Sequence, residues 1–172
     1  MRRRANDWAD PVEWLFRQTR SQWGRERYDG DTWQGLHVLA IAGALLRTPD
    51  TPELREHFGS GNTPNDRQAP YPMLRLVALM NVRSHLILDA QLSPRQSRRP
   101  AVSGALGIEL GFRDIKSSLQ QNAMTLRSKA KELIYQEVWG LLLAYNIIRR
   151  EAGQTAVALG HATSDSSPWP NT

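Results

Sequence analysis

The stretch MLRLVALMNVRSHLILDAQL (Met73–Leu92) decides the fold of this chain. It contains two apolar runs, Met73–Met80 and His85–Leu92, separated by the short polar sequence NVRS. Runs of this length joined by a polar turn predict two antiparallel strands of a hairpin. The run LHVLAIAGALL (Leu36–Leu46) is also short and apolar and is followed by Pro49, so it predicts a further buried strand. We therefore expect an antiparallel sheet of about three strands from Leu36 to Leu92.

An N-terminal helix is predicted to begin at Asp10. Aspartate is a favourable N-cap, and Pro11 suits the first helical position. The side chains that follow recur on one face at helical spacing: Val12, Leu15, Phe16, Thr19 and Trp23. The segment Thr48–Asn65 is interrupted by proline and glycine, which predicts a long loop.

Two more helices are predicted in the C-terminal part of the chain. The first carries one apolar stripe: Ile108, Phe112, Ile115 and Leu119. The second is expected to begin at Ser128 as N-cap and to end at Gly153. Its predicted apolar face comprises Ile134, Val138, Leu141, Tyr145 and Ile148. Further apolar residues broaden that face, which predicts a buried helix with a close approach at Gly140.

These elements predict an α+β fold in which an N-terminal helix and two C-terminal helices cover the sheet. Residues 1–94 form the half with the first helix and the strands, and residues 105–153 form the helical half. The segment 95–104 is rich in arginine, serine and proline and is typical of a linker or of a junction between unlike segments. The polar segment 154–172 predicts a disordered tail.

The composition limits the possible functions. The chain has 172 residues, a formal charge of +5 and no cysteine. The absence of cysteine excludes a disulfide scaffold, a cysteine-ligated zinc site and a thiol nucleophile. The positive charge, nearly all of it arginine, favours a polyanionic partner, although GC-rich codon usage produces the same arginine excess. The apolar runs are too short to span a bilayer, so we expect no membrane partner and a cytoplasmic protein.

One set of charged residues on the first C-terminal helix has two interpretations. Glu109, Arg113, Lys116 and Gln120 lie on the face opposite the apolar stripe. A carboxylate beside two cations could hold a divalent metal and the oxygens of a phosphate. Spacing alone favours a solvated helical face, on which a Glu109–Arg113 pair contributes roughly 0.3–0.5 kcal/mol. The cluster Arg95, Arg98 and Arg99 is likewise either a nucleic-acid contact or an exposed basic linker.

Four segments resemble DDE transposases of the insertion-sequence-four family. IELGFRDIKSSLQ (Ile108–Gln120) and TLRSKAKELIYQEVWGLLLAYNIIRRE (Thr125–Glu151) resemble the family's C-terminal catalytic region. Leu36–Ser60 and Tyr71–Pro94 resemble its first catalytic strand, the loop that follows and the next hairpin. The resemblance implies a ribonuclease H-like core that cuts and joins DNA with two divalent metals, such as Mg²⁺, held by two aspartates and a glutamate.

The same resemblance assigns site residues. Glu109 occupies the position of the metal-binding catalytic glutamate, and Lys116 that of the motif's lysine, both as vestiges of the site. Arg113 and Lys116 would contact DNA. Val102 and Ala105 stand where the motif has tyrosine and arginine, and Ala42, before Gly43, stands where the first aspartate belongs.

The segment that would carry the second aspartate is replaced by the 95–104 junction, as an internal deletion or frameshift would produce. Asp50 and Asp89 are nearby substitutes, but they lie on a loop and at a strand end. We therefore expect an incomplete ribonuclease H-like core that holds Mg²⁺ poorly and lacks strand transfer. The alternatives are a non-catalytic DNA-binding or regulatory derivative, which binds terminal inverted repeats or intact transposase, and an inert remnant. The expected location is the bacterial cytoplasm, with nucleoid association if the chain binds DNA.

Overall fold

The computed structural model describes residues 10–23, 34, 36–59, 71–82, 84–95 and 125–159. Within them the elements follow in this order: α1 (Asp10–Trp23), β1 (Leu39–Arg47), α2 (Pro52–Phe58), β2 (Met73–Asn81), β3 (Ile87–Pro94) and α4 (Lys131–Ala158). The predicted α+β class, the N-terminal helix and the three-stranded sheet are confirmed. The predicted helix Ile108–Leu119 and the 95–104 junction, apart from Arg95, lie outside the described residues.

The sheet is antiparallel, in the order β1-β2-β3. Arg47 pairs with Met73 across β1 and β2, and Leu74 pairs with Pro94 across β2 and β3. The hairpin turn is longer than predicted, because β3 begins at Ile87 rather than at His85. Asn81 closes this turn, since its carbonyl accepts from the amide of His85, whose φ is 58°.

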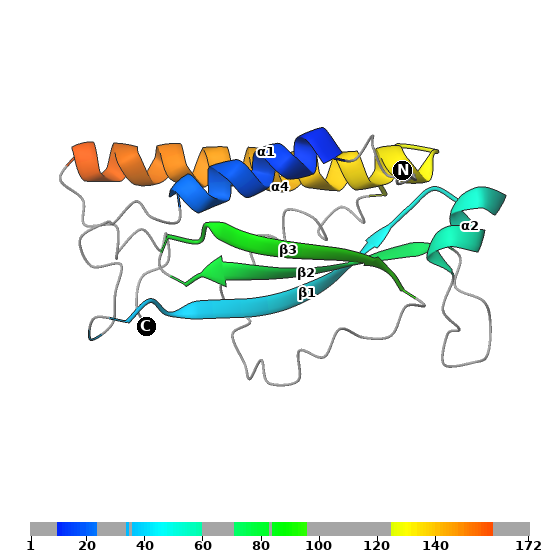
Figure 1. The fold of residues 1–172 in the computed structure, drawn as a ribbon, viewed down its shortest axis with the longest axis horizontal. Coiled ribbons are helices and arrows are strands. Elements are labelled where there is room, and N and C mark those ends of the chain that lie inside the picture. The colour runs from blue at the N-terminus through cyan, green and yellow to red at the C-terminus, as the bar shows by residue number, and fades with distance from the viewer. Residues whose placement is uncertain are drawn as a thin grey trace, which may run out of the picture.

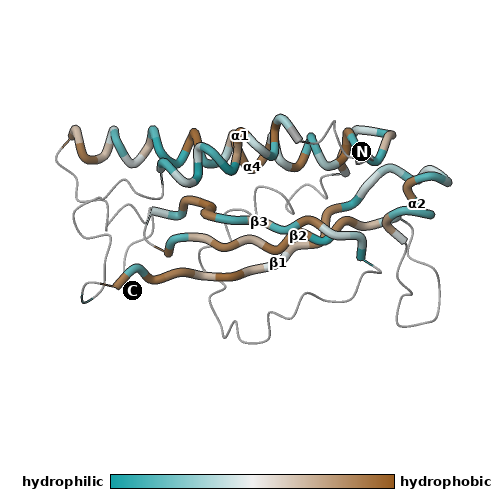
Figure 2. Tube along the Cα trace, viewed as in Figure 1, coloured by the Kyte–Doolittle hydropathy of each residue, from teal (hydrophilic) through white to brown (hydrophobic). Residues whose placement is uncertain are grey.

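Helices α1 and α4 lie side by side on one side of the sheet, and α2 lies at the end where β1 finishes (Figure 1). We call the sheet face toward α1 and α4 the inner face. The ring centroids of Phe16 and Trp139 are 5.2 Å apart, which joins the two helices. Figure 2 shows hydrophobic residues along much of β1 and β2. The inner face buries Leu46, Leu74, Leu76, Ala78 and Met80 in a single core with both helices.

The prediction of an irregular loop over Thr48–Asn65 is wrong for Pro52–Phe58, which forms α2. Thr51 caps this helix, because its side chain accepts a hydrogen bond from the amide of Leu54. Pro52 occupies the first turn, where proline is tolerated. Leu54 and Phe58 are fully buried, so packing secures a helix that is too short to be stable alone.

Helix α4 differs from the prediction at both ends. Its N-cap is Ala130 rather than Ser128. The Glu137 carboxylate accepts from the amide of Arg127 at 2.9 Å and from that of Ser128 at 3.0 Å, which holds the chain before the helix. The helix continues past Gly153 to Ala158, so residues 154–158 of the predicted tail are helical. Residues 160–172 lie outside the described part.

The buried face of α4 is also rotated relative to the predicted one. It comprises Ile134, Val138, Trp139, Leu142 and Asn146. Ile148, which we expected to be buried, is 67% exposed. The buried face of α4 includes Trp139, because its ring packs against Phe16 of α1. The close approach expected at Gly140 is not found among the described residues, none of which, beyond the neighbouring turns of α4, lies within 4 Å of a Cβ placed there.

Candidate functional site

Ala42, which the resemblance assigns to the position of the family's first catalytic aspartate, lies in the middle of the sheet. Ala42 is in β1, where it is partly buried against the core. It pairs with Ala78 of β2, which in turn pairs with Ala90 of β3. We call these three residues the alanine row. Methyl groups offer no oxygen to a metal ion, so this row contains no ligand for Mg²⁺.

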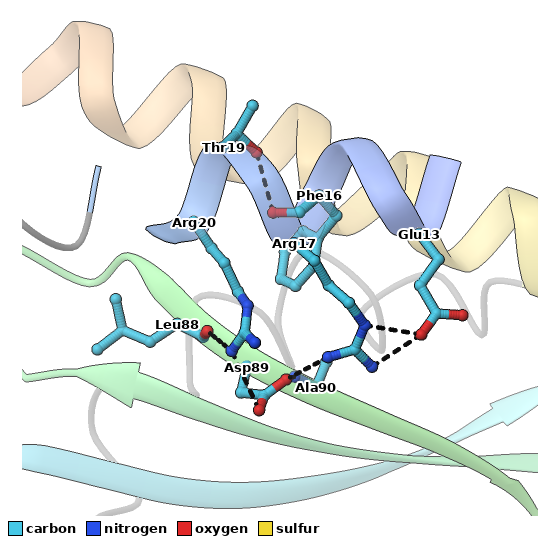
Figure 3. A network of polar contacts seen from close by, with 8 residues as sticks. All are labelled: Glu13, Phe16, Arg17, Thr19, Arg20, Leu88, Asp89 and Ala90. Atoms are coloured by element: carbon cyan, nitrogen blue, oxygen red, sulfur yellow. Dashed lines mark hydrogen bonds and ion pairs between the residues drawn. The ribbon is translucent and has the colours of Figure 1, made fainter. Parts of the chain in front are cut away.

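Asp89, one of the two candidate substitutes, neighbours the alanine row but faces α1 (Figure 3). Its Oδ1 lies 3.1 Å from Nη1 of Arg17, and its Oδ2 lies 3.0 Å from Nη1 of Arg20. Glu13 is a second partner of Arg17, at 2.7 Å. The Asp89 carboxylate therefore links β3 to α1, and both of its oxygens are engaged by arginine.

Asp50, the other candidate substitute, lies beyond the end of β1. Its carboxylate is paired with the Arg55 guanidinium. The hydrogen bond from Arg55 is the main reason that the pKa of Asp50 is below its ordinary value. Ala42 lies five residues before the end of β1 at Arg47, which corresponds to about 17 Å of extended strand. Two catalytic metals lie only about 3.5–4 Å apart, so Asp50 and the alanine row do not form one such site.

The described residues therefore do not fit a two-metal centre. Among them, no group of three or more histidine, aspartate or glutamate side chains could hold a metal ion. The predicted site residues Glu109, Arg113 and Lys116 lie outside the described part of the chain. Their catalytic, metal-binding and DNA-binding roles stay predictions.

A second polar cluster joins α2 to α4. Nε2 of His57 lies 3.1 Å from the hydroxyl oxygen of Tyr135. Burial lowers the pKa of His57, and the nearby positive charge of Lys131 lowers it further. Burial also raises the pKa of Tyr135. Both shifts follow from the cost of burying charge and from the packing of α2, so we assign this pair to stability.

Three arginines gather at one end of the sheet on its outer face, the face opposite α1 and α4. Arg47 ends β1, Arg75 lies near the start of β2, and Arg95 follows β3. Arg47 pairs with Met73, whose carbonyl accepts from the amide of Arg95. We call these three residues the arginine end. Sequence reasoning singled out Arg95 but missed Arg47 and Arg75, whose only signal is a cation near the end of an apolar run.

Within the described part of the chain, no helix combines the length and the apolar character that crossing a bilayer requires. This finding includes α4, the longest described helix.

Comparison with known proteins identifies the family. The chain is 48% identical over 139 residues to the Escherichia coli (strain K12) protein named "Putative transposase InsZ", which covers 80% of this chain and 42% of that protein. It is 30% identical over 162 residues to "Transposase InsG for insertion sequence element IS4" of the same organism, covering 92% of this chain and 34% of that protein. The chain thus spans less than half the length of these curated relatives. No family model and no solved structure matches it. The resemblance seen in the sequence is confirmed, and the chain is a transposase-derived protein of the IS4 family.

Proposed function

We propose that this chain is a DNA-binding derivative of an IS4-family transposase that does not cleave or join DNA. The alanine row carries the catalytic part of the proposal. The resemblance assigns one of its members, Ala42, to the position of the family's first aspartate, and the register pairs Ala42 with Ala78, which pairs with Ala90. Two divalent metals put four positive charges beside one phosphate, and several carboxylates are needed to hold them. Asp89 and Asp50, the nearest substitutes along the chain, are engaged by arginines instead.

DNA is the proposed partner. The net charge of +5 favours a polyanion, and the relatives are named as transposases. The proposed targets are the terminal inverted repeats of an insertion element. A derivative that occupies these ends, or that pairs with an intact transposase, would act as a regulator of transposition. Such a protein would work in the bacterial cytoplasm, at the nucleoid.

An end-cleavage assay tests the catalytic part. The full chain is incubated with labelled terminal-repeat DNA and either Mg²⁺ or Mn²⁺, with an intact family transposase as positive control. We expect no metal-dependent nicking or strand transfer. Cleavage that requires metal and is abolished by Glu109→Ala would contradict the proposal, because it would place a working site at that glutamate. Cooperative unfolding of the same preparation excludes misfolding as the cause of inactivity.

A binding assay tests the partner. We expect retardation of terminal-repeat DNA in a gel at low salt, and a steep loss of affinity as salt rises, because neutralised phosphates release counterions. The absence of binding at low salt would leave the inert remnant as the better description. Inhibition of an intact transposase on the same DNA would support a regulatory role over simple occupancy.

A further inference from the structure

The arginine end gathers three guanidinium groups on one face of the sheet. Arg47 lies in β1, Arg75 in β2 and Arg95 directly after β3, and neighbouring strands lie roughly 4.7–4.9 Å apart. Arg47 and Arg95 flank Met73 in one row of the sheet. Arg75 is two residues further along β2, so its side chain rises from the same face as that of Met73. The guanidinium groups are thus carried on adjoining strands of one rigid sheet.

The side chains of Arg47 and Arg95 contact neutral groups, and that of Arg75 also contacts a carbonyl. The guanidinium carbon of Arg47 lies 5.7 Å from the ring centroid of Tyr71. Nη1 of Arg95 lies 3.5 Å from Sδ of Met73. Nη2 of Arg75 donates to the carbonyl of Arg95 at 3.0 Å. The contacts of Arg47 and Arg95 orient their side chains without supplying a negative charge.

Other arginines of the described chain are used differently. Arg17 and Arg20 are paired with Asp89, and Arg55 is paired with Asp50. Those cations hold elements together, since Arg17 and Arg20 tie α1 to β3. Neither Arg47 nor Arg95 has such a carboxylate partner among the described residues.

Two further cations lie in the segment beside β1. The amide of Leu126 donates to the carbonyl of Arg47 at 2.9 Å, which places the residues before α4 next to the arginine end. Arg127 and Lys129 are both exposed there. Glu137 is one carboxylate near this segment, and its oxygens accept from the amides of Arg127 and Ser128.

We propose that the arginine end binds the phosphate backbone of duplex DNA. This inference rests on the proposed function and locates its DNA contact on residues outside the family's catalytic motif. Guanidinium groups form forked hydrogen bonds with phosphate oxygens, and arginine is always charged at cellular pH. Contacts of this kind position DNA without reading its sequence. The arginine end therefore supplies affinity that is independent of the terminal-repeat sequence.

The test uses two double variants with the same net charge. Arg47→Gln/Arg95→Gln removes two cations of the arginine end. Arg55→Gln/Arg150→Gln removes two cations that the structure pairs with carboxylates elsewhere. Binding of a labelled duplex to the full chain is measured by fluorescence anisotropy over a series of salt concentrations. A duplex of unrelated sequence is measured in parallel.

We expect the first variant to lose roughly tenfold in affinity for each arginine, equally for both duplexes. Its negative slope of log affinity against log salt should become shallower by about 0.9 for each lost phosphate contact. The control should keep the wild-type slope. Arg47→Lys/Arg95→Lys retains the charge, so its salt dependence of binding should be close to that of the wild type. Equal affinities and slopes for the two glutamine variants would overturn the inference but leave the proposed function intact. Absence of binding by the unmodified chain would overturn both.

Discussion

The two faces of the three-stranded sheet are built from the same strands but differ in burial. On the inner face, Leu74, Leu76 and Met80 of β2 are between 0% and 1% exposed, because α1 and α4 cover them. On the outer face, Leu39, Ile41 and Leu45 of β1 are between 37% and 42% exposed. Substitutions on the inner face should therefore change stability, whereas substitutions on the outer face should change what the protein binds. The predictions with a control on the outer face, for Phe16 and Ala42, test this division directly, and the others test the contacts that hold the helices to the sheet and to one another.

The largest effect is expected from Phe16→Ala. Phe16 is fully buried and packs on Trp139, so its loss removes apolar contact and leaves a cavity between α1 and α4. We expect the free energy of unfolding to fall by about 3–5 kcal/mol, measured by urea denaturation. Leu45→Ala on the outer face is the control and should change stability by less than about 1 kcal/mol. Similar losses for both variants would show that the two faces are equally buried.

Asn146→Ala should have the next largest effect. Asn146 is fully buried on α4. Its Oδ1 accepts from the amide of Ile87 at 2.8 Å, and its Nδ2 donates to the carbonyl of Ile87 at 2.9 Å. The substitution leaves the amide and the carbonyl of Ile87 without this partner. We expect the free energy of unfolding to fall by about 1–3 kcal/mol for a buried unpaired group. Gln91→Ala, on the exposed side of β3, is the control and should be nearly neutral. Equal stabilities by urea denaturation would contradict this assignment.

Asn146 also illustrates what the sequence did not predict. Short apolar runs predicted the strands and a period-3.6 apolar pattern predicted α4, because burial of apolar groups dominates both. A polar residue on an apolar helix looks like an interruption of that pattern. Its role depends on Ile87, which lies 59 residues away in the chain. Helix α2 was missed for the same reason. Leu54 and Phe58 become buried only in the folded protein, where they join a core with residues of the strands and α4.

For the candidate site, the sequence supplied an assignment by resemblance, which stays a prediction. Ala42 was assigned to the first aspartate position, and the register pairs it with Ala78, which pairs with Ala90. The engagement of Asp89 by Arg17 and Arg20 was not predictable, since it requires α1 to lie along β3. The arginine end was missed for a similar reason, because Arg47, Arg75 and Arg95 become neighbours only through strand pairing.

Ala42→Asp tests whether the inner face can hold a metal. The new carboxylate would be partly buried beside the alanine row, and we expect a loss of about 1–3 kcal/mol in the free energy of unfolding. Added Mg²⁺ should not reverse this loss, because the carboxylate of Asp89 on β3 is engaged by arginine and Asp50 lies too far along the chain. Leu45→Asp introduces the same charge on the outer face as a control. Thermal stabilisation of Ala42→Asp alone by Mg²⁺ would contradict the proposed inactivity.

Asp89→Asn should have a smaller effect. It weakens the two ion pairs that tie α1 to β3, but the Asp89 side chain is 45% exposed, so water and salt screen them. We expect a loss of about 0.5–1 kcal/mol at low salt, which shrinks at about 1 M salt. Glu13→Gln, which removes only the partner within α1, should lose less. An equal loss for Asp89→Asn at both salt concentrations, measured by urea denaturation, would mean that packing rather than charge is responsible.

The smallest expected effect is a pH dependence at His57. Burial and Lys131 lower its pKa in the folded state, while Glu132 and Glu53 oppose the shift. The unfolded chain therefore takes up a proton more readily, with a pKa near 6.5. This contribution to stability is complete above about pH 6.5 and is lost as pH falls through the lower folded pKa.

His57→Gln should flatten this part of the pH profile, measured as the urea midpoint between about pH 7.5 and about pH 5.5. Tyr135→Phe is the informative control, because it removes the partner at 3.1 Å but leaves His57 packed against Phe58. If burial causes the shift, Tyr135→Phe keeps the decline at acid pH and His57→Gln loses it. If Tyr135→Phe also flattens the profile, the hydroxyl rather than burial determines the protonation of His57. An unchanged decline in His57→Gln would assign the acid sensitivity to other groups, and the α2–α4 contact would then contribute only packing.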